Sequence, residues 1–80
     1  MRYTVVVIPD EEDGGFAAYV PAIPNCFTHG DTLEHAVEMA KDAAAALLAS
    51  FAAHDEEIPV EAAGTVVRTI EVASPVGVPA

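Results

Sequence analysis

The first thirty residues alternate between short apolar runs and turn-forming residues, which is typical of a small antiparallel sheet. Residues 3–8 predict a first strand. Because four β-branched residues follow one another there without a polar face, we expect both sides of this strand to be covered. Residues 16–20 predict a second strand, joined to the first by the acidic turn at residues 10–15, whose two glycines accept positive φ angles. Residues 25–29 predict a short third strand.

The clearest element is an amphipathic helix predicted over residues 32–53. Its apolar residues recur at helical spacing and form one stripe. They are Leu33, Ala36, Val37, Ala40, Ala44, Leu47, Leu48 and Phe51. Asp31 or Thr32 offers the N-cap oxygen, and we interpret Asp31 as the cap because Glu34 then stands where a capping-box carboxylate belongs. The many alanines favour a slim helix that lies close to the sheet.

Residues 65–73 predict a last strand, because apolar and polar positions alternate there. The two faces would carry Val66, Ile70 and Val72 on one side and Val67, Thr69 and Glu71 on the other. The element order is then β-β-β-α-β, an α+β fold in which one long helix packs across a small antiparallel sheet. We expect residues 1–80 to form a single domain, one so small that an isolated copy is only marginally stable.

Charge narrows the possible functions. Three Lys and Arg against thirteen Asp and Glu give a net charge of −10, which leaves too few cations to neutralise nucleic-acid phosphates or to bind an anionic membrane. The same charge suits a basic partner. The single cysteine, Cys26, excludes an internal disulfide, and the apolar run before Pro9 is too short for a signal peptide. We therefore expect a cytoplasmic protein.

The segment between the second strand and the helix, residues 21–36, reads PAIPNCFTHGDTLEHA and resembles the signature of the HicB-like antitoxin family. The acidic, glycine-containing turn before it and Ile58-Pro59 after the helix also match, so the likeness runs from Tyr3 to at least Val60. Asn25 stands where the family usually has glycine, and Asn tolerates positive φ better than most residues.

The resemblance implies a partial ribonuclease-H-like sheet and a partner of the HicA type, a small basic RNA-cleaving toxin that the antitoxin blocks. Many family members also carry a C-terminal DNA-binding domain, and no such segment is expected here, so the resemblance implies no direct binding of nucleic acid. We predict an antitoxin domain that binds and neutralises a HicA-like toxin. The alternative is an orphan module that self-assembles without a toxin. In both cases we expect a homodimer or homotetramer through sheet edges or the alanine-rich helix face.

Two acid-rich segments are the candidate contacts with the toxin's Lys and Arg side chains. The residues are Asp10, Glu11, Glu12 and Asp13 in the first segment, and Asp55, Glu56 and Glu57 in the second. Such segments would steer association with a basic partner.

We expect no catalytic, cofactor or metal site, and hence no enzyme. Three alternatives remain open. Asp10, the one acid near a strand end, could serve a metal-dependent nuclease, which usually needs several converging carboxylates. The acidic run could hold a cation, although it lacks EF-hand spacing. Cys26 with His29 and His35 could bind zinc, although a small buried thiol is the more common role for a lone cysteine.

Overall fold

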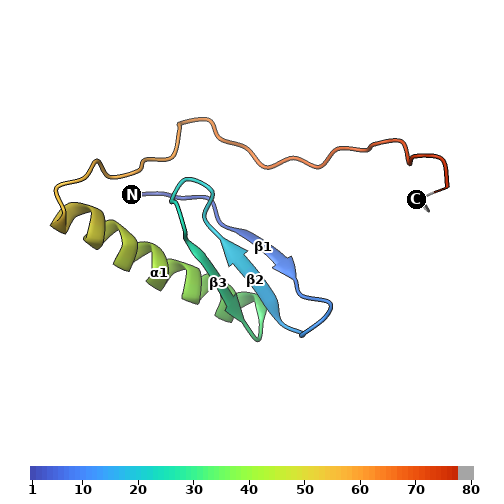
Figure 1. The fold of residues 1–80 in the computed structure, drawn as a ribbon, viewed down its shortest axis with the longest axis horizontal. Helices are drawn as coiled ribbons and strands as arrows, with labels where there is room; N and C mark the ends of the chain where they lie inside the picture. Colours follow the sequence, from blue (N-terminus) through green and yellow to red (C-terminus); the bar gives the residue numbers. More distant parts are fainter. Residues whose placement is uncertain (78–80) are drawn as a thin grey trace.

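The computed structural model describes residues 1–77, and within them it contains three strands and one helix (Figure 1). The elements are β1 (Val6–Pro9), β2 (Phe16–Tyr19), β3 (Phe27–Gly30) and α1 (Leu33–Ala53). The strands form one antiparallel sheet in the order β1-β2-β3, and α1 packs across one face, mainly over β3 and β2. The predicted antiparallel sheet crossed by one long helix is confirmed. The ribonuclease-H-like relationship stays a prediction.

The strand register determines which side chains face the helix. Val7, Ala18 and Thr28 lie opposite one another in the three strands and therefore share a face. Ala18 is fully buried, and the Thr28 hydroxyl donates to the carbonyl oxygen of Ala36 in α1 at 3.5 Å. This is the face that α1 covers.

The other side of the sheet, which we call the open face, carries the alternate residues Val6, Ile8, Tyr19 and Phe27. Ile8 is 48% exposed and Phe27 is 67% exposed. The expectation that the first strand would be covered on both sides is therefore wrong. The run of β-branched residues indicated a strand correctly, but a single helix can cover only one face of a three-stranded sheet.

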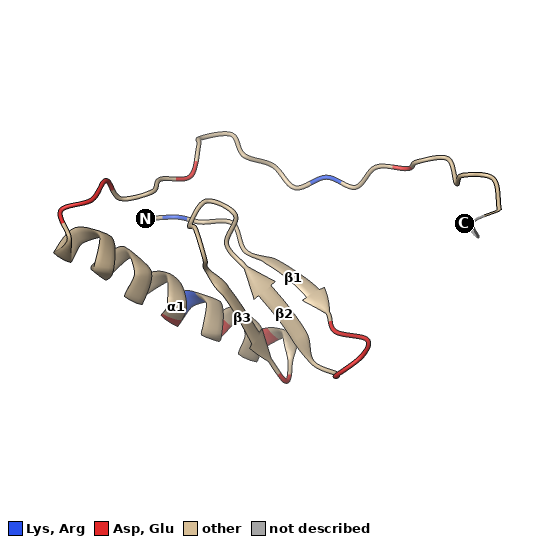
Figure 2. Ribbon diagram, in the orientation of Figure 1, with Lys and Arg blue, Asp and Glu red and all other residues tan. Residues whose placement is uncertain are grey.

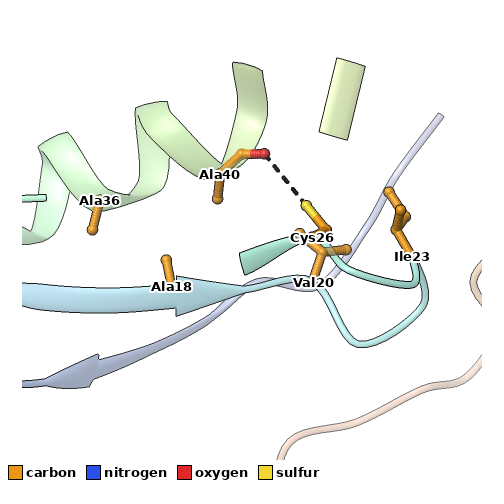
Figure 3. Packing of buried hydrophobic residues seen from close by; sticks show 6 residues of the cluster. All are labelled: Ala18, Val20, Ile23, Cys26, Ala36 and Ala40. Atoms are coloured by element: carbon orange, nitrogen blue, oxygen red, sulfur yellow. Dashed lines mark hydrogen bonds between the residues drawn. The ribbon is translucent and has the colours of Figure 1, made fainter. Parts of the chain in front are cut away.

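A small apolar core fills the space between sheet and helix, with larger, partly buried side chains packed around it (Figure 3). The buried residues are Ala18, Val20, Ile23, Cys26, Ala36 and Ala40. On the helix, the positions closest to the strands are alanines, which let the two layers approach closely. The thiol of Cys26 points at α1, where Sγ donates to the carbonyl oxygen of Ala40 at 3.8 Å.

Cys26 should react slowly with thiol reagents as long as the domain is folded. It is 3% exposed, and burial raises the pKa of the Cys26 thiol, so little reactive thiolate forms. We expect its reaction with Ellman's reagent near pH 8 to be about a hundredfold or more slower in the folded protein than in urea, because exposure requires an opening that costs a few kcal/mol. Equal rates in the two states would contradict this packing.

The helix begins as predicted, but its cap is Thr32 and not Asp31. The Thr32 hydroxyl accepts from the backbone N–H of His35 at 3.0 Å, and the backbone at Thr32 is extended, as an N-cap requires. In return, the ring of His35 accepts from the backbone N–H of Asp31 at 3.2 Å. His35 thus stands at the capping-box position, one residue further along than the sequence suggested, but its ring accepts from the residue before the cap.

The predicted fourth strand at residues 65–73 is absent from the described part of the chain. After α1 the backbone runs without strand pairing to residue 77, and it leaves the sheet in an extended path (Figure 1). We call residues 65–73 the C-terminal arm. The alternating pattern is present, but a strand also needs an adjacent backbone to pair with, and among residues 1–77 no strand pairs with the arm. Nor does any helix among residues 1–77 have the length and apolar character needed to span a membrane.

Candidate functional site

The first acidic segment forms the turn between β1 and β2. The backbone N–H of Asp10 donates to the carbonyl oxygen of Gly15, and that of Gly14 donates to the carbonyl oxygen of Asp10, both at 3.0 Å. The Asp10 carboxylate accepts from the backbone N–H groups of Glu12 and Asp13 at 3.1 and 3.0 Å. Gly14 and Gly15 have φ angles of +77° and +74°. The predicted hairpin turn is confirmed, and Asp10 is the side chain that orders it.

His29 links β3 to this turn. Its Nε2 atom lies 3.0 Å from the carbonyl oxygen of Gly14 and 3.5 Å from Oδ2 of Asp10. The pKa of Asp10 is lowered, first by the hydrogen bond from the backbone of Asp13, and further by the backbone of Glu12 and the nearby His29. Asp10 therefore serves the turn itself. The side chains of Glu11, Glu12 and Asp13 are exposed and are available to a partner.

Asp10 should titrate below its ordinary pKa of 3.8 in the folded protein. Because folding lowers this pKa, the carboxylate stabilises the native state above about pH 4, and that contribution disappears as the pH falls through the folded-state pKa. A carboxyl NMR titration should show the shift, and Asp10→Ala should remove the acid-dependent contribution and speed amide exchange at Glu12 and Asp13. A midpoint at or above 3.8 would show that these hydrogen bonds do not hold the charged carboxylate.

The second acidic segment follows the last turn of α1. The backbone N–H of Asp55 donates to the carbonyl oxygen of Ala52 at 3.2 Å, and that of Glu56 to the carbonyl oxygen of Phe51 at 2.9 Å, so the chain turns away from the helix at this point. Asp55 has a positive φ of 55°. The side chains of residues 55–57 are exposed.

The structure does not bring the two acidic segments together. The turn at residues 10–13 lies at one end of the domain and residues 55–57 lie at the other, beyond the far end of α1 (Figure 2). The seven candidate side chains therefore form two separate acidic surfaces. A small partner would contact one of them, and a partner that contacts both would have to reach along the whole domain.

The alternative sites predicted from sequence gain no support from the geometry. Asp10 is engaged by the turn, and the acids that accompany it point from a loop rather than from neighbouring strands. Cys26 faces α1, whereas His29 reaches the hairpin turn on the other side of the sheet. Among residues 1–77 no three His, Cys, Asp or Glu side chains are grouped so that they could hold a metal ion.

Sequence reasoning missed the aromatic pair on the open face. Tyr19 and Phe27 are cross-strand partners, and their rings stack with centroids 6.2 Å apart. Val6 lies opposite Tyr19 on the next strand, so the three side chains form one apolar row. Strand geometry could have predicted this pair, because successive side chains of a strand point to opposite faces. Tyr19 therefore lies on the face opposite Ala18, which is buried.

Comparison with known proteins identifies the family. The family model described as "HicB_like antitoxin of bacterial toxin-antitoxin system" matches residues 3–73. The chain belongs to the HicB-like antitoxin family. The resemblance seen in residues 21–36 is thereby confirmed, and it extends over most of the chain.

Individual relatives of this HicB-like chain differ in length. It is 44% identical over 59 residues to UPF0150 protein Ta0767 of Thermoplasma acidophilum, a match that covers 74% of this chain and 84% of that protein. It is 34% identical over 60 residues to UPF0150 protein ssr1765 of Synechocystis, covering 75% of each. It is also 43% identical over 60 residues to Antitoxin HicB 1 of Photorhabdus laumondii, covering 75% of this chain but 38% of that antitoxin.

The fold explains parts of the HicB-like signature. Asn25 has a φ of +63°, so the place where the family usually has glycine is a place where glycine costs least. The loop that contains it is closed by hydrogen bonds between the backbones of Val20, Ile23 and Cys26. Residues 21–36 therefore form the loop, β3 and the start of α1, and we interpret their role as structural.

Proposed function

We propose that this HicB-like domain is a non-enzymatic, cytoplasmic antitoxin that binds and neutralises a small basic RNA-cleaving toxin of the HicA type. The observation that carries the proposal is the match of residues 3–73 to a family of antitoxins. The 43% identity to Antitoxin HicB 1 supports it, although the aligned region spans only 38% of that protein. The net charge of −10 adds an independent physical reason, because it complements a basic nuclease.

Within this proposal, the acidic turn is the preferred contact with the toxin. Glu11, Glu12 and Asp13 are exposed on a loop whose backbone is held by Asp10 and by the two glycines. A fixed cluster of carboxylates loses less conformational entropy on binding than a flexible one does. The segment Asp55, Glu56 and Glu57, at the opposite end of the domain, is a second contact that a larger partner could use.

An RNA-cleavage assay tests this function directly. A HicA-type toxin encoded in the same genome is incubated with RNA and increasing amounts of the purified chain. We expect cleavage to stop near one antitoxin chain per toxin, and we expect the chain alone to leave RNA intact. Undiminished cleavage at a large excess of the chain would contradict the proposal, and magnesium-dependent cleavage of an RNA–DNA hybrid that Asp10→Asn abolishes would favour the nuclease alternative.

A further inference from the structure

The C-terminal arm carries four exposed aliphatic side chains. Val66, Val67, Ile70 and Val72 are 73%, 69%, 82% and 78% exposed. Scattered surface aliphatics are ordinary, but in an extended segment Val66, Ile70 and Val72 share one side, and such a row of exposed apolar side chains typically marks an interaction site. These residues are also strong strand formers.

The arm leaves from an anchored position. The hydroxyl of Tyr3 donates to the carbonyl oxygen of Pro59 at 2.5 Å, and Thr4 donates to the Glu61 carboxylate from its backbone N–H at 2.5 Å and from its hydroxyl at 3.0 Å. A turn follows, in which the N–H of Thr65 donates to the carbonyl oxygen of Ala62 at 3.2 Å and Gly64 has a φ of +85°. The segment before the arm is therefore fastened to its own chain, and the turn directs the arm outward.

The arm does not pair with the sheet of its own chain. A groove of about 470 Å³ separates the start of the arm, residues 65–68, from Thr4 and Val6. Beyond it the arm runs away from the sheet (Figure 1). At nine residues it is about 30 Å long when extended, more than twice the length of β1.

An edge that could receive such an arm is present in every copy. β1 is the outermost strand, and no strand lies on its outer side among residues 1–77. Its one protective feature is Pro9, because β1 has no charged side chain to discourage pairing. Val6 and Ile8 of β1 lie on the open face beside this edge. An added strand would bury its own aliphatic side chains against them.

We propose that the arm of each chain forms a fourth strand on the outer edge of β1 of a second copy, so that two chains exchange arms. Such an exchange closes with twofold symmetry, supplies the strand partner that the arm lacks, and covers the unpaired edge of β1. It also restores the predicted β-β-β-α-β order, with the last strand contributed by the partner. The proposal does not depend on toxin binding.

Charge favours a second copy over a basic toxin as the occupant of this edge. The arm carries Arg68 and Glu71, which cancel, whereas the whole chain carries −10. A neutral arm adds nothing to the electrostatic repulsion between two acidic copies. It also has no net negative charge that would attract a basic protein. The acidic surfaces at the two ends of the domain remain available to such a partner.

Proline substitution in the arm tests the exchange. Alternate N–H groups of a strand point to opposite sides, so one of the two variants Thr69→Pro and Ile70→Pro removes a donor to β1. We expect the unaltered chain to have twice the 8.3 kDa mass of one chain by size exclusion with light scattering. At least one proline variant should raise the dimer dissociation constant about tenfold or more. Thr69→Val is the control, because it keeps the N–H, the β-branched shape and all the aliphatic side chains of the arm.

Isotope-filtered NMR on a mixture of labelled and unlabelled chains then locates the contact. The proposal predicts intermolecular NOEs between methyl groups of the arm and amides of β1, with the α1 signals of the proline variants unchanged. A monomer at high micromolar concentration would overturn it. So would a dimer that both proline variants leave intact, a dimer whose intermolecular NOEs lie on α1, or an arm that pairs with β1 of its own chain.

Discussion

Gly30→Ala should lower the free energy of unfolding by about 3 kcal/mol or more, which is a large part of the stability expected for so small a domain. Gly30 ends β3 directly beneath the first turn of α1. A methyl group there would overlap the backbone N of Ala36 and come within 2.7 Å of its Cα and of the carbonyl carbon of His35. Because these are backbone atoms, the helix can accept the methyl group only by moving away from the sheet. Urea unfolding followed by the circular dichroism of α1 measures the loss.

Gly14→Ala is the matched control for this substitution. Gly14 has a positive φ of 77°, but a methyl group there would meet no atom within 4 Å. The cost is then that of the left-handed backbone alone, about 1 kcal/mol. If Gly30→Ala destabilised the protein no more than Gly14→Ala, the close approach of α1 to β3 would be wrong.

Under the proposed function, replacement of Glu11, Glu12 and Asp13 by Ser should slow association with a HicA-type toxin about tenfold at low salt, because the three exposed carboxylates would no longer attract a basic partner to the acidic turn. The difference from the unaltered chain should shrink as added salt screens the charges. Stopped-flow mixing at several salt concentrations gives the association rates.

A second triple variant separates a local contact from overall charge. Glu34, Glu38 and Asp42 are exposed on α1, and their replacement by Ser removes the same three negative charges elsewhere. We expect this variant to associate nearly as fast as the unaltered chain. Equal slowing in both variants would mean that only net charge matters, and no slowing in either would exclude the acidic turn as a contact.

The parts of the fold that depend on neighbouring residues could be predicted from the sequence. The 3.6-residue pattern gave α1 nearly to the residue, and the glycines after the acidic run gave the hairpin turn. The interpretation of Asp31 as the cap was wrong, because the choice between Asp31 and Thr32 depends on the backbone angles at Thr32 and on the unexpected role of His35.

Features that depend on contacts between distant parts of the chain could not be predicted from the sequence, or were predicted wrongly. Strand formation at residues 65–73 needs a neighbouring backbone, and the alternation of apolar residues does not say whether one is present. Whether one or both faces of β1 are covered depends on how many helices pack against the sheet. The separation of the acidic turn from residues 55–57 follows from the length of α1, which carries the second segment to the far end of the domain.

Recovery of the chain from its native lysate at low and high salt tests the antitoxin function most directly. We expect a small basic protein to accompany the chain at low salt and to be released at high salt. The released protein should cleave RNA, and addition of the chain in equal amount should stop the cleavage. A preparation that contains only copies of this chain at both salt concentrations, from cells that express it at its native level, would contradict the antitoxin function and favour a self-assembling module without a toxin.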